Sequence, residues 1–177
     1  MFLLDLIFGK HSKAKPAPKT ELAPPPEAAQ VVAPGTSIHY HPEIIEQFKH
    51  DHRELLRIYT GIKAAIAAQD LPRCAELLED FRHTLHGHLL SENVRLYIYL
   101  EHALASDPTS HELMHSFRHE MDDIGKAVVA FLERYRHLAE HPEQLPQFAH
   151  ELDGIGKVLV ERIKREEETL YPLYMPA

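Results

Sequence analysis

Apolar residues recur at a helical period in four stretches of the chain after Pro42. Within each stretch they return every three or four residues, so they would line one face of an α-helix. The four stretches run from Ile45 to Ile62, from Leu78 to Leu100, from Met114 to Tyr135 and from Leu152 to Leu170. Proline and polar residues interrupt the pattern at 69–72, 106–110 and 140–146. The pattern therefore predicts four long helices and no strand.

The connections between these predicted helices are short. Short connections place successive helices side by side in opposite directions, so we expect an all-α, antiparallel, up-down-up-down four-helix bundle. Asp70 directly precedes Leu71 and Pro72 at the start of the second helix. A side-chain oxygen in that position accepts a hydrogen bond from a free backbone N–H of the first turn. We therefore expect Asp70 to cap the second helix.

Five ionisable side chains fall on the core-facing stripes of the predicted helices. They are His52, His88, Glu92, Arg162 and Glu166. Burying such groups in a bundle core costs free energy unless they are paired with one another or bind a metal ion. This cluster is therefore the candidate functional site of the chain.

The second and fourth helices contain the same short motif. In "HGHLLSENVRLY" at 86–97 and "VERIKREEETLY" at 160–171, a Glu is followed by Leu four residues later and by Tyr five residues later. The residue four positions before that Glu differs, because it is His88 in the first copy and Arg162 in the second. A His at this spacing forms a metal-ligand pair with the Glu, whereas an Arg offers no ligand atom.

The first and third helices repeat each other as well. "KHDHREL" at 49–55 aligns with "RHEMDDI" at 118–124, and the alignment places His52 opposite Met121. The bundle is therefore predicted to consist of two similar halves, each made of two helices. Only the first half has histidines at the positions that face the shared core.

The first half offers the ligands of a metal site. His88 and Glu92 lie one helical turn apart, and His52 would approach from the neighbouring helix. Two His and one carboxylate suit iron(II) and leave coordination positions for water or a small ligand. Glu166 would add a fourth protein ligand. The predicted ligands are therefore His52, His88, Glu92 and Glu166, and the predicted cofactor is a single non-haem iron ion.

The second half differs at two ligand positions. The thioether of Met121 is a poor ligand for iron, and Arg162 carries a fixed positive charge that repels a metal dication. Two interpretations remain open from the sequence. Either Arg162 tunes or blocks the second metal position beside one iron ion, or no metal binds and its guanidinium bridges Glu92 and Glu166.

Residues 43–174 resemble the hemerythrin-like, cation-binding HHE domains. That family has a His early in the first helix, His-x3-Glu in the second, a His in the third, and His-x3-Glu in the fourth, often followed by Leu and Tyr-Pro. The matching residues here are His52, His88, Glu92, Glu166 and "LYP" at 170–172, and the departures are Met121 and Arg162. The resemblance implies a four-helix bundle with a non-haem iron centre. The two departures argue against a complete di-iron centre and against reversible oxygen binding.

The last helix carries a second, narrower resemblance. "FAHELDGIGKVLVERIKREEETL" is similar to the last helix of the regulator-of-sigma-D anti-sigma proteins, a helical family that binds the primary sigma factor without this iron site. The residues that fit are Phe148, Leu152, Ile155, Gly156, Leu159, Arg162 and Glu166. The first helix fits poorly, because that family has a Trp there and this chain has none. This resemblance implies a metal-independent, protein-binding regulator as the alternative function.

Composition narrows the class of partner. Residues 41–177 carry 15 Lys and Arg and 24 Asp and Glu, a net charge of −9, whereas nucleic-acid binding needs a basic surface. We therefore expect no nucleic-acid partner, whereas a basic protein partner is compatible with this charge.

The single cysteine, Cys74, excludes an internal disulfide and suits a reducing compartment. Among the fifteen histidines, His111, His115 and His119 form a stripe turned away from the core, for which we expect a solvated face.

The chain opens with a short apolar segment and a proline-rich stretch. Residues 1–10 include Phe2, Leu3, Leu6 and Ile7, which would share one face of a short helix, but the segment falls short of the roughly 20 apolar residues that span a bilayer. Three alternatives are open: docking on an anionic membrane surface, docking on a protein partner, or a weakly ordered start. Residues 11–40 are rich in Pro, Ala, Lys and Glu and read as a disordered tether, which leaves 41–177 for the bundle.

These patterns together predict a hemerythrin-like protein that binds non-haem iron through a partly lost di-iron site. We expect it to bind or sense oxygen, redox state or iron rather than to turn over a substrate, because no substrate-specific motif accompanies the site. Weak oxidase or peroxidase activity of that iron stays open as a further alternative. The expected location is the cytoplasm. If residues 1–10 dock on a membrane, the protein would lie at the inner membrane surface.

Overall fold

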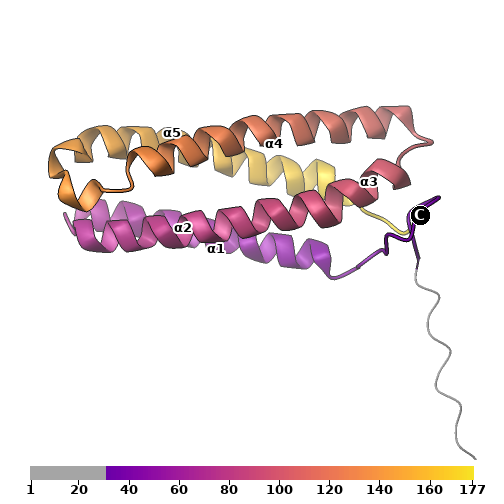
Figure 1. Cartoon of the computed structure of the whole chain (residues 1–177), viewed down its shortest axis with the longest axis horizontal. Coiled ribbons are helices and arrows are strands. Elements are labelled where there is room, and N and C mark those ends of the chain that lie inside the picture. Colours follow the sequence, from indigo (N-terminus) through magenta and orange to yellow (C-terminus); the bar gives the residue numbers. More distant parts are fainter. Residues whose placement is uncertain (1–30) are drawn as a thin grey trace, which may run out of the picture.

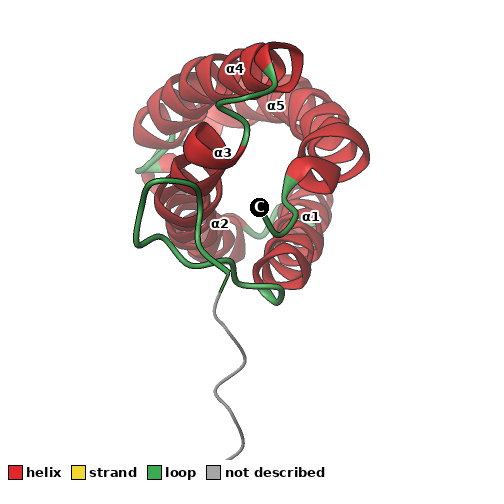
Figure 2. Cartoon of the chain, turned by 90° about the vertical axis from the view of Figure 1, so that its right-hand side faces the viewer, coloured by secondary structure: helices red, strands yellow, loops and turns green. Residues whose placement is uncertain are grey.

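Four helical rods lie side by side along the long axis of the molecule (Figure 1). This computed structural model describes residues 31–177. The helices are α1 (Ile44–Ala67), α2 (Leu71–Ser91), α3 (Ile98–Ala103), α4 (Pro108–Arg134) and α5 (Leu145–Arg165). A π-helical turn at Glu92–Tyr97 joins α2 to α3, so these form one rod, and a second π-helical turn at Glu166–Leu170 extends α5. The predicted all-α four-helix bundle is confirmed, and viewed end-on its rods surround a common centre (Figure 2).

Side-chain caps fix the starts of α2 and α4. The Asp70 carboxylate accepts a hydrogen bond from the backbone N–H of Arg73 at 3.1 Å, which confirms the predicted cap. The Asp107 carboxylate does the same for the N–H of Ser110 at 3.2 Å. A proline lies in the first turn of both helices, where its missing N–H is not needed for helix formation. These caps fix the residues at which α2 and α4 begin, and the short connections before them keep each helix beside the one that precedes it.

The apolar core consists of two clusters. One lies toward the connections between α1 and α2 and between α4 and α5, and it includes Ile58, Phe81, Phe131 and Phe148. The other lies toward the opposite end, and it includes Phe48, Leu100, Met114 and Tyr171. Along three of the rods, the ionisable core residues fall between members of these two clusters, and along α4 the buried Met121 takes this place. The bundle therefore has a polar layer across its middle, closed by apolar packing at both ends.

The two π-helical turns begin at the two carboxylates of this layer. A π-helix bonds each residue to the one five positions on, so it turns residues i and i+5 toward the same side. Tyr97 follows Glu92 by five residues and Tyr171 follows Glu166 by five, and both tyrosines are buried. In a regular α-helix, residue i+5 would point well away from residue i. The π-helical turns are therefore what brings each tyrosine into the polar layer.

The N-terminal predictions lie beyond what the structure describes. Phe2, Leu3, Leu6 and Ile7 and residues 11–30 of the expected tether lie outside the described residues. Residues 31–40 are described, and here the prediction of a disordered tether is wrong, because Val32 and His39 form an antiparallel bridge and Ala33 is fully buried against the bundle. Among residues 31–177, no helix is both long and apolar enough to span a bilayer. The docking segment and its membrane or protein partner therefore stay predictions.

Two glycines of α5 offer a matched test of its packing. Gly156 faces the ring of Tyr59 in α1 so closely that an added Cβ would collide with it, whereas nothing lies near an added Cβ at Gly154. We expect Gly154→Ala to raise the free energy of unfolding by about 0.5–1 kcal/mol, because alanine is the better helix former. Gly156→Ala is expected to lower it, because the Tyr59 ring must move. Urea unfolding followed by circular dichroism checks both, and an equal gain from both variants would contradict the contact.

Candidate metal centre

Five ionisable side chains form the polar layer of the bundle. They are His52, His88, Glu92, Arg162 and Glu166, and none exposes more than 4% of its surface. At this depth solvent does not screen or hydrate a charge, so each group depends on partners within the protein or on a bound cation. The sequence predicted that these five residues face the core, and the structure confirms this burial.

His52 in α1 is held between two acidic residues of the second half. Its Nδ1 lies 2.8 Å from Oε1 of Glu167, and its Nε2 lies 3.2 Å from Oε2 of Glu166. A proton on Nδ1 serves Glu167 and leaves the Nε2 lone pair facing another acceptor oxygen. Two lone pairs at that distance repel each other unless a second proton or a metal cation lies between them. A neutral imidazole can donate to only one of these two carboxylates, and a metal cation between Nε2 and Glu166 would satisfy the other contact.

His88 in α2 repeats this orientation from the facing helix. Its Nδ1 lies 3.5 Å from Oδ2 of Asp51, and its Nε2 lies 3.9 Å from Oε2 of Glu92. The two imidazole rings lie with their centroids 4.7 Å apart. In metal sites, a ligating histidine usually directs its other ring nitrogen at a carboxylate or carbonyl, which fixes the ring and its tautomer. Glu167 is hydrogen-bonded to His52 in that position, whereas Asp51 lies on that side of His88 without a hydrogen bond to its Nδ1.

Glu92 is held on one side only. Its Oε1 accepts a hydrogen bond from the Tyr171 hydroxyl at 3.2 Å, and that hydroxyl also lies 3.2 Å from Nε2 of His52. Its Oε2 is buried and has no hydrogen-bond partner. Such an unsatisfied carboxylate oxygen is unusual in a folded protein and is explained where it faces a ligand position.

Arg162 organises the other half of the layer. Its Nε donates to Glu166 at 2.5 Å, and its Nη1 donates to Glu120 at 2.9 Å. Its Nη2 donates to the Tyr97 hydroxyl at 3.1 Å and to the backbone carbonyl of Phe117 at 2.9 Å. A guanidinium has donors and no acceptor, so it cannot be a ligand to a metal ion. The groups around Arg162 are therefore satisfied by protein contacts alone, and Arg162 offers no ligand atom at its position.

The two buried carboxyl groups differ in their electrostatics. Burial, together with the nearby charge of Glu166, raises the pKa of Glu92 well above its ordinary value. Burial also pushes the pKa of Glu166 upward, but the hydrogen bond that His52 donates when its Nε2 carries a proton, and the charge of Arg162, outweigh it, so this pKa lies below its ordinary value. Glu166 is therefore the more readily ionised member of the pair. A positive charge close to Glu92, such as a metal ion, would favour its ionised form.

The structure brings three of the predicted ligands into one compact group. Ligand atoms of His52, His88 and Glu166 all lie within 4.8 Å of one another. Glu92 borders this group through its contact with His88. The donor set of two imidazoles and carboxylate oxygens, together with the unpartnered oxygen of Glu92, fits a divalent metal ion of borderline character. Met121, at the lost ligand position on α4, is buried with 9% exposure.

Sequence reasoning missed the groups that support these ligands. Asp51 directly precedes His52, and Glu167 directly follows Glu166, so both were visible as neighbours of predicted ligands. Their roles depend on contacts across different helices, which periodicity does not reveal. In the sequence Tyr171 is visible only as the Tyr of the repeated motif, and the structure shows that its hydroxyl points toward Glu92 and His52.

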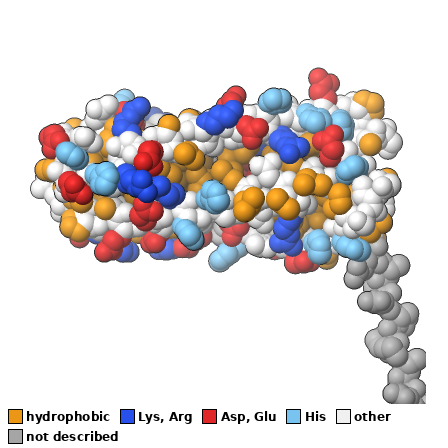
Figure 3. All heavy atoms as spheres, viewed as in Figure 1, with side chains coloured by type: hydrophobic (Ala, Val, Ile, Leu, Met, Phe, Trp, Pro, Cys, Tyr) orange, Lys and Arg blue, Asp and Glu red, His pale blue; other side chains and the backbone are white. Residues whose placement is uncertain are grey.

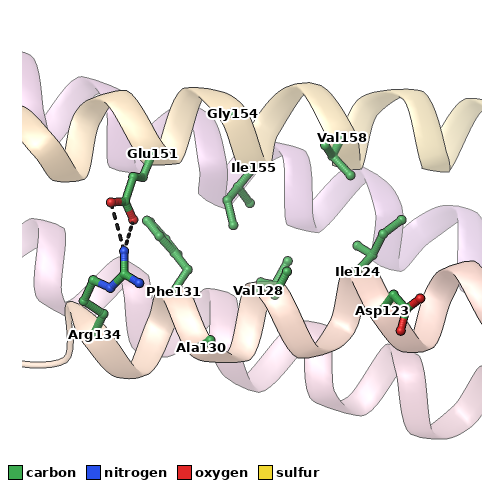
Figure 4. Close-up of a pocket in the computed structure, with 11 residues that line it drawn as sticks. Asp123, Ile124, Val128, Ala130, Phe131, Arg134, Glu151, Gly154, Ile155 and Val158 are labelled. Atoms are coloured by element: carbon green, nitrogen blue, oxygen red, sulfur yellow. Dashed lines mark hydrogen bonds and ion pairs between the residues drawn. The ribbon is translucent and has the colours of Figure 1, made fainter.

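A separate apolar groove lies on the surface between α4 and α5 (Figure 4). It encloses about 630 Å³, and its walls include Val128, Phe131 and Ile155, which face one another across the gap. Arg134 and Glu151 form an ion pair across one end, with contacts of 2.9 and 2.8 Å. None of the five polar-layer residues lines this groove. It is therefore a surface feature apart from the candidate metal centre.

The fold and this centre define a class of protein, a four-helix bundle with a buried His and carboxylate site. The comparison with known families gives the same answer, since the model of the hemerythrin HHE cation binding domain matches residues 43–174. The chain therefore belongs to the hemerythrin HHE cation-binding domain family. Comparison with curated proteins and with solved structures returned no match.

The Arg162 network is tested by removing its guanidinium from the metal-free chain. Arg162→Ala is expected to lower the free energy of unfolding by about 3–5 kcal/mol, because it leaves a buried carboxylate without its counter-charge. Arg165→Ala is the matched control, since Arg165 lies on the same helix, donates to the same Glu120, and is 42% exposed. That control is expected to cost about 0–1 kcal/mol. Similar losses for the two variants in urea unfolding would contradict the network.

Proposed function

We propose that this chain binds one non-haem iron ion through His52, His88, Glu92 and Glu166, and that it acts by binding or sensing rather than by turnover. The observation that carries the proposal is the orientation of the two histidines. Both direct Nε2 toward the carboxylates of the layer, and both have a carboxylate behind Nδ1. Two imidazoles with carboxylate oxygens are a ligand set that suits iron(II).

The proposal of one ion rather than two rests on Arg162. Its guanidinium supplies a fixed positive charge to Glu166 and is held by Glu120, Tyr97 and the Phe117 carbonyl. A second dication beside it would be repelled and would find Met121 in place of a histidine. The first half keeps its ligands, so the chain carries a mononuclear version of a two-fold repeated site.

The protein's own residues have defined tasks in this centre. Glu167 holds the His52 imidazole by a hydrogen bond to Nδ1, and a proton there leaves Nε2 free as a ligand atom. Asp51 lies 3.5 Å from Nδ1 of His88, too far for a hydrogen bond, so it would have to move closer to hold the second imidazole in the same way. Tyr171 donates a hydrogen bond to Glu92 and so fixes the direction of its free oxygen. A bound iron ion would supply open coordination positions and redox chemistry to small ligands.

Binding or sensing is favoured over turnover by the burial of the centre. Every predicted ligand is at most 4% exposed, so a small molecule or an electron reaches it more easily than an organic substrate does. The proposed location is the cytoplasm, where the buried and unpaired Cys74 would stay reduced. The signal itself would be oxygen, redox state or iron availability.

Metal content tests this proposal directly. The full chain, purified without chelator or loaded anaerobically with Fe(II), is expected to hold about one iron per chain by elemental analysis. His88→Ala is expected to abolish retention, because it removes one of two imidazole ligands. His86→Ala is the matched control, since His86 lies on the same helix and is exposed. Less than about 0.2 iron per chain in the wild type would contradict the proposal.

The asymmetry of the two halves is tested by restoring the lost ligands. The double variant Met121→His/Arg162→His is expected to raise the iron content from about one toward two per chain, since both halves then offer histidines. Met121→His alone leaves the guanidinium in place and is expected to remain near one. A double variant that gains no iron, although folded by circular dichroism, would show that Arg162 is not what limits the site.

A second candidate function is metal-independent regulation by binding a protein partner, as in anti-sigma proteins. It is favoured by the network around Arg162, which satisfies its half of the layer without any metal. Under this alternative the chain holds no metal, and a protein co-purifies with it through contacts that weaken as salt rises. Recovery of iron-loaded chain without any partner would decide against it.

A further inference from the structure

A second group of metal-ligating side chains lies on the surface, where α3 meets α4. It consists of Glu101 near the end of α3, and of His111 and His115 near the start of α4. Ligand atoms of all three lie within 4.8 Å of one another. In Figure 3, several histidine side chains lie at the right-hand end of the molecule, the end at which α3 is joined to α4. The group shares no residue with the buried centre.

The two histidines converge on one carboxylate. Nε2 of His111 lies 3.1 Å from Oε1 of Glu101, and Nε2 of His115 lies 3.3 Å from Oε2. The rings stand at 70° to each other with centroids 4.6 Å apart, so they approach from different directions. Ligand atoms bound tetrahedrally at about 2.1 Å from one zinc ion lie about 3.4 Å apart. The observed separations from the carboxylate therefore need only small side-chain movements to hold an ion.

The backbone keeps these three residues in place. His111 and His115 lie one helical turn apart, so they share one face of α4. The connection from α3 to α4 is short, and the Asp107 cap fixes the start of α4 only four residues before His111. The ligands thus come from two helices whose relative position is set by the fold. This differs from two histidines on one exposed helix, which would lack the third ligand.

The group is partly open to solvent. The side chains of Glu101, His111 and His115 expose 35%, 29% and 43% of their surfaces. A polar hollow of about 300 Å³ lies against His115 and is lined also by Arg118, His119 and Asp122. An ion and its water ligand therefore have access, in contrast to the buried centre. The His111, His115 and His119 stripe faces solvent as expected, and the structure adds that Glu101 pairs with the first two.

We propose that Glu101, His111 and His115 form a surface site for a borderline divalent ion, with Zn²⁺ as the ion that fits best. Two imidazoles and one carboxylate are a known ligand set for zinc, and water completes the tetrahedron. The ion links α3 to α4, and it stabilises the folded chain because the unfolded chain does not hold the three ligands together. The site requires no iron in the centre, so it stands independently of the proposed function.

Zinc retention with the buried histidines removed tests the proposal. The full chain without an affinity tag, carrying His52→Ala/His88→Ala, is dialysed against Zn²⁺ and then analysed for metal. It is expected to hold about one Zn²⁺ per chain, and to lose it when Glu101→Gln or His115→Asn is added. His119→Asn is the matched control, because His119 continues the same stripe outside the group, and it is expected to leave retention unchanged.

The outcomes that overturn the site are also defined. The proposal fails if the double variant holds no zinc, if Glu101→Gln retains as much as its parent, or if His119→Asn removes the ion equally well. If the double variant does not fold, the wild-type chain takes its place, and Glu101→Gln should lower its zinc content by about one per chain. In parallel, Zn²⁺ should raise the Tm of the wild-type chain by more than that of Glu101→Gln. Equal Tm shifts would count as failure.

Discussion

The structure depends on the burial of five ionisable side chains between two apolar clusters. Water does not reach this layer, so its charges must balance inside the protein. The two halves of the repeat meet this requirement in different ways. Around Arg162, every interaction comes from the chain itself, through one guanidinium whose partners lie on α4 and on both π-helical turns. Around His52 and His88, electron-rich atoms face one another and one carboxylate oxygen has no partner.

The two halves differ in the source of the positive charge that balances their buried carboxylates. Arg162 carries its positive charge covalently, so its half of the layer is complete as soon as the chain folds. The other half gains an equivalent charge only by taking up protons or a cation, and a cation that binds only the folded chain adds to its stability. One half of the repeat has Arg162 and Met121 where the other has His88 and His52. The charge of the half with Arg162 is therefore permanent, whereas the charge of the half with His88 and His52 depends on bound protons or a bound cation. Such an arrangement suits a protein that reports on metal or redox state.

The sequence predicts the fold and the burial of the site because both follow from the period of apolar residues. A stripe interrupted by His52, by His88 with Glu92, and by Arg162 with Glu166 can only be a core with a polar layer. The π-helical turns are not visible in that period, since they change the register locally and bring Tyr97 and Tyr171 inward. Contacts between helices, such as Glu167 with His52 or Glu101 with His111, depend on how the rods are rotated, which one-dimensional spacing leaves undetermined.

The two halves do not act separately, because side chains cross between them. Tyr171 of the second half donates to Glu92 of the first, and Arg162 of the second half donates to Tyr97 of the first. Tyr171 also begins the short turn that leads to the C-terminal residues, where Tyr174 accepts a hydrogen bond from the backbone N–H of His41. A change in the position of Glu92 or His52 on metal uptake therefore acts on Tyr171 first. From there it reaches the end of the bundle at which both described termini lie (Figure 1), which gives a binding event in the core a physical route to the surface.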